Sequence, residues 1–464
     1  MMRDLAKLSQ SMLTGYLAVF LLLNAFAFNG VLWLVSPEPY EETVLDQTWD
    51  VLRGRGCDDS WGVMSVSLDY VQEHRDKPFY SELFFERKLK VQYPPSSLFA
   101  VAGLRWLVGR DGIRTEECTV YDLPTVADVL GWLFILMSAA SAAALLEIGL
   151  RRQGAPPASG PMLAARFTIV LVLALTFYPL VKAYSLGQIQ TWLNGLFALS
   201  LLCWATGRKV PSGVLLGLMA LVKPHYGLFV LWALLRREWR FATALAATAI
   251  VGVLGSIVVY GFANHVDYLR VLTFLAERGE TFYPNQSVNG LLNRVMVLID
   301  PAQWHSLQFD DHSFPPFSPF VYGGTLIASI VLLAAALPRR GNEGDPDRSF
   351  DFCTMALSIT LASPIAWEHH YGTIFPVLAV LLASAIGNQR RLLLLMGTYV
   401  LISNYIPVTN QLAETILNVA QSYLFAGAIT VLVLLHTTRP GWQLALSPSA
   451  ARMTAPTRSL NPSG

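Results

Sequence analysis

Two adjacent histidines and a glutamate occupy a corner between two apolar runs in the last third of the chain. The segment reads SPIAWEHHYG and begins at Ser363. Imidazole and carboxylate groups can bind a phosphate, transfer a proton or make structural bonds to the backbone. Polar groups at membrane depth are costly and are tolerated mainly in protein cavities. Glu368, His369 and His370 therefore form a candidate site, with structural bonding as the alternative interpretation.

Other polar stretches also flank apolar runs, and their side chains suit acid–base and phosphate chemistry. A carboxylate can act as a general base on a hydroxyl, while lysine and histidine can hold a departing phosphate. Each also has a plain structural interpretation, since Asp46 could cap a helix, Lys223 could reach lipid headgroups and Asn285 could form a turn. The stretches are TVLDQTWDVLRGRGC from Thr43, GQIQTWLNG from Gly187, VKPHYG from Val222 and YPNQSVNGLLNR from Tyr283.

The composition predicts a polytopic membrane protein. Hydrophobic residues make up 53% of the 464 residues and charged residues 14%, whereas soluble proteins carry about 25% charged residues. The mean hydropathy is +0.45. A net charge of +1 provides no basic field for a nucleic acid partner.

Membrane spans need about 20 apolar residues, and the sequence predicts about 12 of them in an all-α fold. A shorter pair, 210–222 and 225–236, is split at Lys223 and is either a hairpin or one broken span. The other predicted spans are 12–35, 123–149, 164–183, 189–206, 243–262, 320–338, 352–367, 371–387, 392–407 and 416–436.

Basic residues at the ends of the spans predict their sidedness, because cytoplasmic loops are enriched in lysine and arginine. This rule favours the hairpin, with its tip and all the polar stretches on the outer face, in a bacterial plasma membrane. Segment 93–109 is then re-entrant or interfacial, or else a true span if 210–236 crosses once. In the first arrangement Cys57 and Cys118 are both outside and either form a disulfide or remain free thiols.

The domain organisation expected from this pattern is one membrane domain, 1–445, followed by a disordered cytoplasmic tail, 446–464. Within the domain, 36–92 forms a large first extracytoplasmic loop and 263–319 a second one. A carboxylate, a lysine and histidines on one outer face suit glycosyl transfer from a lipid-phosphate sugar. Such a donor needs no Gly-rich nucleotide-phosphate loop, and the chain contains none.

Five motifs, in this order, resemble glycosyltransferase family 87, whose members have a GT-C membrane fold and use polyprenyl-phosphate sugars. The resemblance runs from about Leu45 to Tyr371. Its motifs are VQYPPSSLF from Val91, Gly187-Gln188 with Asn194, the helix-and-lysine segment GVLLGLMALVKPHYG from Gly213, Asn285-Gln286-Ser287 with Arg294, and SPIAWEHH from Ser363.

The resemblance implies roles for individual residues. An aspartate in the first outer loop is the expected general base, and Asp46 matches the family spacing through Trp49 and Gly54. Asp50 is a rival, because Gln47 stands where the family usually has phenylalanine. Donor phosphate would be bound by Lys223, His225, His369 and His370, and the substrate pocket lined by Trp49, Tyr93, Gln188, Asn194, Asn285, Gln286, Arg294 and Trp367.

The expected function is transfer of mannose or arabinofuranose from a polyprenyl-phosphate donor to an envelope glycolipid or polysaccharide. No cofactor is expected. A bound metal is not expected either, because the spacing of the His and Glu residues gives no tetrahedral set of ligands. The donor, the acceptor and membrane lipids are the expected partners. A flippase of lipid-linked saccharide and an envelope polysaccharide polymerase or ligase are the alternatives.

Overall fold

The computed structural model describes most of the chain, and its described part is helical. The described residues are 13–35, 43–54, 56–74, 77–108, 126–153, 155–300, 304, 314–338, 348–386, 388–413 and 415–438. The predicted all-α class is thereby confirmed for this part of the chain. Residues 446–464, predicted to be disordered, lie outside the described residues.

The described residues form a series of helices. Their bounds are η1 (Leu22–Phe28), α2 (Asn29–Val35), α3 (Val44–Leu52), α4 (Asp59–Glu73), η2 (Ser81–Glu86), η3 (Pro95–Ser97), α5 (Leu98–Val108), α6 (Val126–Arg152), α7 (Gly160–Leu175), α8 (Tyr178–Ser185), α9 (Gln190–Ala205), α10 (Lys209–Val222), η5 (Pro224–Gly227), α11 (Leu228–Leu235), α12 (Trp239–Tyr260), α13 (Phe262–Arg278), α14 (Val288–Ile299), α15 (Pro319–Ala336), α16 (Arg348–Ala362), η6 (Glu368–Thr373), α17 (Ile374–Ala385), α18 (Gln389–Ser403), η7 (Pro407–Leu412), η8 (Asn418–Ser422) and α19 (Tyr423–Thr437).

Five helices of the described part are long and apolar enough to cross a membrane, which supports a multi-pass membrane protein. They are Leu13–Leu32, Ala127–Arg152, Trp239–Tyr260, Pro319–Ala336 and Asn418–Thr437. A sixth span results if α7 and α8, bent by 59°, are counted as one. The other predicted spans contain helices of 8 to 16 residues, so the predicted number of about 12 spans is not confirmed.

Residues 210–236 form a hairpin, as one of the two interpretations of the sequence predicted. Lys209, at the start of α10, lies 3.9 Å from Glu238, just beyond α11. The two ends of the segment therefore meet, which a single span would not allow. Gly213 and Gly217 let α10 pack closely on α12, since a Cβ on either would come within 3 Å of a backbone oxygen of α12. Small residues permit this kind of close helix contact in membranes.

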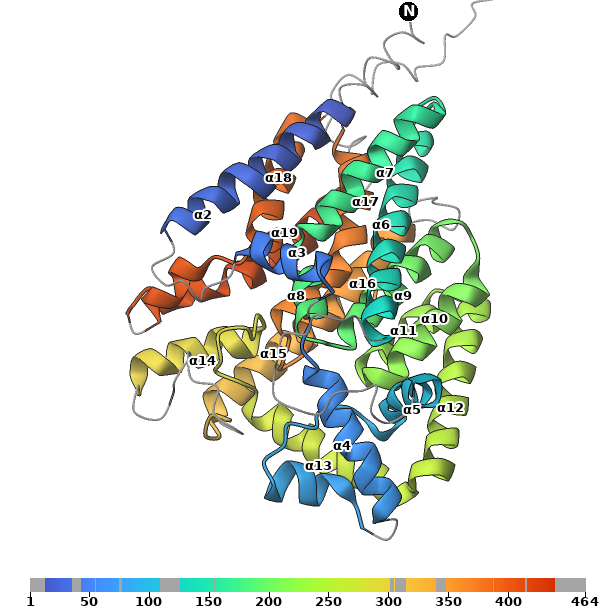
Figure 1. Cartoon of the computed structure of the whole chain (residues 1–464), viewed down its shortest axis with the longest axis vertical. Helices are drawn as coiled ribbons and strands as arrows, with labels where there is room; N and C mark the ends of the chain where they lie inside the picture. The colour runs from blue at the N-terminus through green and yellow to red at the C-terminus, as the bar shows by residue number, and fades with distance from the viewer. Residues whose placement is uncertain are drawn as a thin grey trace, which may run out of the picture.

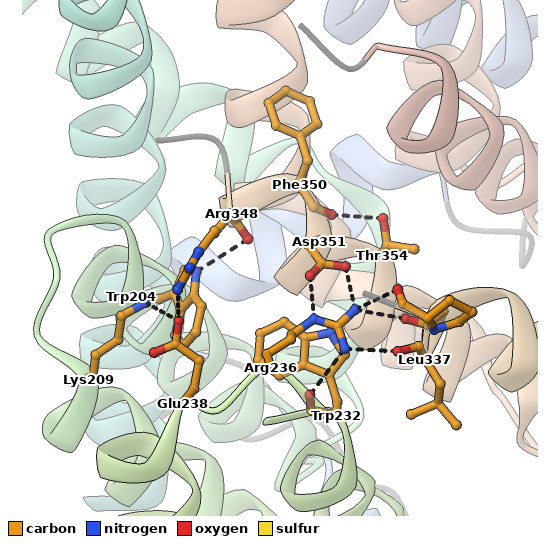
Figure 2. A network of polar contacts seen from close by, with 12 residues as sticks. Trp204, Lys209, Trp232, Arg236, Glu238, Leu337, Arg348, Phe350, Asp351 and Thr354 are labelled. Carbon is orange, nitrogen blue, oxygen red and sulfur yellow. Dashed lines mark hydrogen bonds and ion pairs between the residues drawn. The ribbon is translucent and has the colours of Figure 1, made fainter. Parts of the chain in front are cut away.

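A buried polar network ties the two ends of this hairpin to α15 and α16 (Figure 2). The Arg236 guanidinium forms two bonds with the Asp351 carboxylate. It also donates to the carbonyls of Trp232, Ala336, Leu337 and Pro338 at 3.0–3.2 Å. Three of these carbonyls stand at the C-terminal end of α15, where helices leave acceptors unsatisfied.

The segment 93–109 does not contain a helix long enough to span. Its helix α5 has 11 residues, or about 16 Å at 1.5 Å per residue. Arg105 of α5 bonds Asp69 of α4 at 2.6 Å and 3.0 Å. α4, α5 and α13 lie together at one end of the molecule, and α6 and α7 extend towards the other (Figure 1). The alternative of a true span at 93–109 is therefore not supported.

The described parts of the two predicted outer loops are largely helical. Residues 36–92 contain α3, α4 and η2, while 263–319 contains most of α13 and all of α14. The two segments contact each other, since Asp267 of α13 accepts bonds from the backbone N–H and hydroxyl of Ser81 at 2.7 Å and 2.9 Å. Cys57 is disulfide-bonded, and Cys118, its predicted partner, lies outside the described residues.

We expect Arg236→Met to destabilise the fold, because it leaves the carboxylate of Asp351 buried without its partner. Losing one partner of a buried ion pair costs about 3–5 kcal/mol. Thermal unfolding in detergent, followed by size exclusion, measures the change. Arg237→Met is the matched control, since Arg237 is exposed. Equal unfolding midpoints for both variants would contradict the role given to Arg236.

Candidate active site

A pocket brings together residues from four distant segments of the chain. Its walls come from the N-terminus of α4, the segment before η3, the turn before α9 and the corner before α17. Five predicted site residues, Tyr93, Gln188, Trp367, His369 and His370, lie in this lining. The full lining is Asp59, Val63, Lys90, Gln92, Tyr93, Gln188, Ile365, Trp367, His369 and His370.

The histidine corner is held by a short antiparallel pairing within an otherwise helical structure. Asn285 and Trp367 form an isolated β-bridge. The Gln286 N–H donates to the Ala366 carbonyl at 2.8 Å, and the Glu368 N–H donates to the Pro284 carbonyl at 3.1 Å. Residues 284–286 therefore set the position of the backbone that carries His369 and His370.

The side chain of Asn285 completes this support. It is fully buried, and its amide group donates to the carbonyls of Glu280 at 2.9 Å and Pro364 at 3.1 Å. Its oxygen accepts from the Ser287 hydroxyl and the Ala366 N–H. Asn285, predicted to line the substrate pocket, is thus occupied in holding the corner.

Three more predicted pocket residues are buried supports rather than lining residues. Gln286 donates to the carbonyls of Tyr283 and Gln421 and accepts from the Phe425 N–H. Arg294 donates to the Ser422 hydroxyl and to the carbonyls of Tyr283 and Asn285. Asn194 packs against Gly372, where a Cβ would lie 2.1 Å from the Asn194 amide nitrogen. These residues affect the pocket by holding the histidine corner in place.

The carboxylate in the pocket belongs to Asp59, which the sequence analysis did not select. The Gln188 amide donates to Asp59 Oδ2, and the Tyr93 hydroxyl donates to Gln188 Oε1 at 2.7 Å. Desolvation by the pocket walls raises the pKa of Asp59, while the hydrogen bond from Gln188 and then the charge of Lys90 lower it. Because Asp59 is itself exposed to solvent, water screens the size of this shift.

A tight junction between α8 and α4 places Asp59 beside Gln188. The N–H groups of Cys57 and Asp59 donate to the carbonyls of Ser185 and Leu186 at 2.7 Å and 3.0 Å. Gly187 has a φ of +64°, and a Cβ there would lie 1.8 Å from the Cys57 oxygen. Only glycine meets both demands.

The predicted base Asp46 is used elsewhere. Its carboxylate accepts from the Thr43 N–H at 2.8 Å and from the Thr43 hydroxyl at 2.7 Å, as a cap on α3. Neither Asp46 nor its rival Asp50 lines the pocket. Trp49 is 55% exposed and stacks on Arg53, so the structure does not bring it into the pocket. The aspartate of the first outer loop that does reach the pocket is Asp59.

The two histidines of the corner are neutral. Desolvation by burial lowers the pKa values of His369 and His370, and the charge of Lys223 lowers them further. The Trp367 N–H lies 3.2 Å from His370 Nδ1. An Nδ1 that accepts a hydrogen bond leaves the proton on Nε2, so His370 offers a neutral N–H donor.

His225 lies at the tip of the hairpin in η5, and its ring contacts Tyr226 with centroids 4.9 Å apart. Neither Lys223 nor His225 lines the pocket. The charge of Lys223 nevertheless acts on both histidines of the corner, and His225 acts on His370. The predicted set Lys223, His225, His369 and His370 is therefore grouped in space.

Three charged residues near the pocket were not predicted from the sequence. Lys90 is in the lining, and buried Glu280 lies 3.5 Å from its ammonium. Lys182 of α8 is close enough for its charge to act on Asp59, Glu368 and His369. Asp59 and Lys90 fall in the predicted first outer loop and Glu280 in the second, but no local pattern distinguishes them from other charged loop residues.

The arrangement can support group transfer. A carboxylate, two imidazoles and the ammonium group of Lys90 share the lining of one pocket, and the charge of Lys223 acts on the imidazoles. Such a site can take a proton from a hydroxyl and stabilise a departing anion. No group of three His, Cys, Asp or Glu residues in the described part of the chain is placed to hold a metal.

We expect Asn285→Asp to loosen the corner although the two side chains have the same shape. A carboxylate oxygen would replace the amide nitrogen opposite the carbonyls of Glu280 and Pro364, and two buried acceptors would lose their donor. The cost should be at least about 2 kcal/mol, measured by thermal unfolding. Gln389→Glu, at an exposed position of α18, makes the same chemical change and should have little effect. An unchanged midpoint for Asn285→Asp would contradict the support assigned to this residue.

Comparison with known proteins adds to this geometry. Polyprenol-phosphate-mannose-dependent alpha-(1-2)-phosphatidylinositol mannoside mannosyltransferases are similar to the chain. The protein of Mycobacterium tuberculosis is 25% identical over 240 residues, which is 51% of either chain. That of Mycolicibacterium smegmatis is 26% identical over 218 residues, 46% of this chain and 45% of the relative. The alignments thus span about half the length of these relatives.

No solved structure matches the chain. The sequence profile of glycosyltransferase family 87 matches residues 92–364, more than half of the chain. The matched region includes Tyr93, Gln188 and Lys223, whereas Asp59 precedes it and the two histidines of the corner follow it. The predicted family is confirmed: the chain belongs to glycosyltransferase family 87.

Proposed function

We propose that the chain is a membrane glycosyltransferase that moves a sugar of the mannose or arabinofuranose type from a polyprenyl-phosphate donor to an envelope glycolipid or polysaccharide. Family membership supports the reaction class. The names of the two mycobacterial relatives favour a polyprenol-phosphate mannose donor and a glycolipid acceptor. The observation that carries the proposal is the pocket whose lining Asp59 shares with His369 and His370.

The proposed reaction is a single displacement with inversion at the anomeric carbon. The acceptor hydroxyl oxygen forms a bond to this carbon while the bond from the carbon to the phosphate oxygen breaks. The proton of the acceptor passes to Asp59, and the electron pair of the broken bond stays on the phosphate. No covalent sugar–enzyme intermediate and no metal enters this scheme. Asp59 replaces Asp46 as the proposed base because it is the aspartate in the pocket.

Lys223 and His370 are proposed to hold the phosphate. Burial lowers the pKa of Lys223, and an anion beside it would favour its charged form again. Neutral His370 would donate its Nε2–H to a phosphate oxygen. Positive charge and a neutral donor together stabilise the leaving group without placing several cations in one small volume.

We place this pocket on the outer face of the membrane. α16 begins at Arg348, in the polar network of Figure 2, and ends before the histidine corner. α10 likewise runs from Lys209 in that network to Val222, next to Lys223. Arg236, Arg348 and Lys209 are thus at the opposite end of these helices from the pocket. Basic residues favour the cytoplasmic side, which leaves the pocket outside.

Asp59→Asn should lower kcat by about 10²–10⁴-fold, the usual contribution of a general base. The reaction of purified protein in lipid with polyprenyl-phosphate mannose and octyl α-mannoside measures it. Asp46→Asn is the matched control and should keep kcat within a few-fold. Activity should also fall at low pH, because the base works when ionised and desolvation by the pocket walls raises the pKa of Asp59. An inactive Asp46→Asn beside an active Asp59→Asn would contradict the assignment.

The KM for the donor should hardly change between about pH 5.5 and 8, since burial and the charge of Lys223 lower the pKa of His370 and keep it neutral there. His370→Gln retains an N–H donor and should raise this KM only a few-fold. His370→Ala should raise it about tenfold or more. A donor KM that rises as the pH passes through 6–7 would show instead that a cationic imidazole binds the phosphate.

A further inference from the structure

Glu280 is a buried carboxylate that contacts two walls of the pocket without lining it. It follows α13 and Gly279, which has a φ of +64°, and it is 1% exposed. The Trp367 indole N–H donates to its Oε2, and its Oε1 lies 3.5 Å from the Lys90 ammonium. One side chain thereby connects the histidine corner to the segment before η3.

The backbone of Glu280 is fixed by neighbours that support the corner. Its N–H lies 3.3 Å from Asn289 Oδ1, and its carbonyl accepts from the Asn285 amide at 2.9 Å. Burying a carboxylate is costly, even with a partner. A neutral acceptor could satisfy the indole N–H at a lower desolvation cost. The negative charge of Glu280 must therefore have another role besides accepting this hydrogen bond.

The indole ring of Trp367 is fixed in orientation by its neighbours. Its N–H is bound to Glu280, and its ring meets those of His369 and Phe282 nearly edge-on, with centroids 5.7 Å and 6.0 Å apart and interplanar angles of 70° and 66°. Trp367 lines the pocket, and because its N–H is occupied, the part of the indole left for a ligand is its carbon ring. An aromatic surface of this kind suits the apolar C–H face of a sugar ring.

Glu280 also pairs with one of the cations near the pocket. Lys90 is paired with it, whereas Lys223 has no ion pair in the part of the chain that the structure describes. Lys90 and Glu280 act on Asp59 in opposite directions. Pairing them limits the effect of Lys90 on the base and leaves Lys223 and Lys182 as ammonium groups for an anion.

We propose that Glu280 is a positioning residue that holds Trp367 as the surface on which the terminal sugar of the acceptor lies and neutralises Lys90 beside Asp59. This inference rests on the proposed function and specifies its acceptor as a molecule that ends in a sugar ring. The donor phosphate is then bound at the separate group of Lys223 and His370. Acceptor binding and donor binding should respond differently to changes at Glu280.

Kinetics of purified protein with polyprenyl-phosphate mannose and octyl α-mannoside test the proposal. Glu280→Gln keeps an oxygen for the Trp367 indole and removes only the charge. In this variant the acid limb of the kcat/KM profile should move to lower pH, because loss of the negative charge of Glu280 lowers the pKa of Asp59. Glu280→Ala also removes the indole partner and should raise the KM for the mannoside about tenfold, with the donor KM changed less than about threefold.

Glu277→Gln, an exposed change of the same kind on α13, is the control and should leave the pH profile and both KM values unchanged. If Glu280→Ala does not fold, the pH profile of Glu280→Gln decides the question. An unmoved acid limb in Glu280→Gln, or equal increases of both KM values in Glu280→Ala, would overturn the inference. A wild-type protein that transfers no sugar would instead contradict the proposed function, so the two failures are distinguishable.

Discussion

The antiparallel pairing of residues 284–286 with 366–368 is the constraint on which the pocket depends. The histidine corner contains no regular α-helix, so its backbone groups need partners from elsewhere. The segment that supplies them is held in turn by the buried side chains of Asn285, Gln286 and Arg294. A polar scaffold inside an apolar protein thus fixes two imidazoles and an indole in one wall.

Most of the titratable groups around this wall are neutral, paired or hydrogen-bonded. The imidazoles are neutral, Lys90 is paired with Glu280, and Asp59 is bonded by an amide. Several unpaired charges in one low-dielectric volume would be mutually destabilising unless a ligand compensated them. An anion is the ligand that the remaining ammonium groups would favour, in agreement with a phosphate-linked donor.

The polar network around Arg236 and the polar residues of the pocket have different roles. The network of Arg236 and Asp351 satisfies every guanidinium nitrogen and caps α15, so it holds helices together and offers no free donor. The layer at the other end of α10 and α16 keeps accessible polar groups in a pocket. Helices of fixed length between them hold the pocket at a set distance from the network.

The sequence by itself determined the membrane class, the family, most helix positions and the group of histidines, because apolar runs and motifs are local patterns. It also identified Tyr93, Gln188 and Trp367 as pocket residues. Only the tertiary structure decided that Asp59 rather than Asp46 enters the pocket, and that Asn285 and Arg294 support it from behind. These outcomes depend on contacts between segments more than 70 residues apart, such as Asp59 with Gln188, and no local spacing encodes which of several similar polar residues such a contact will select.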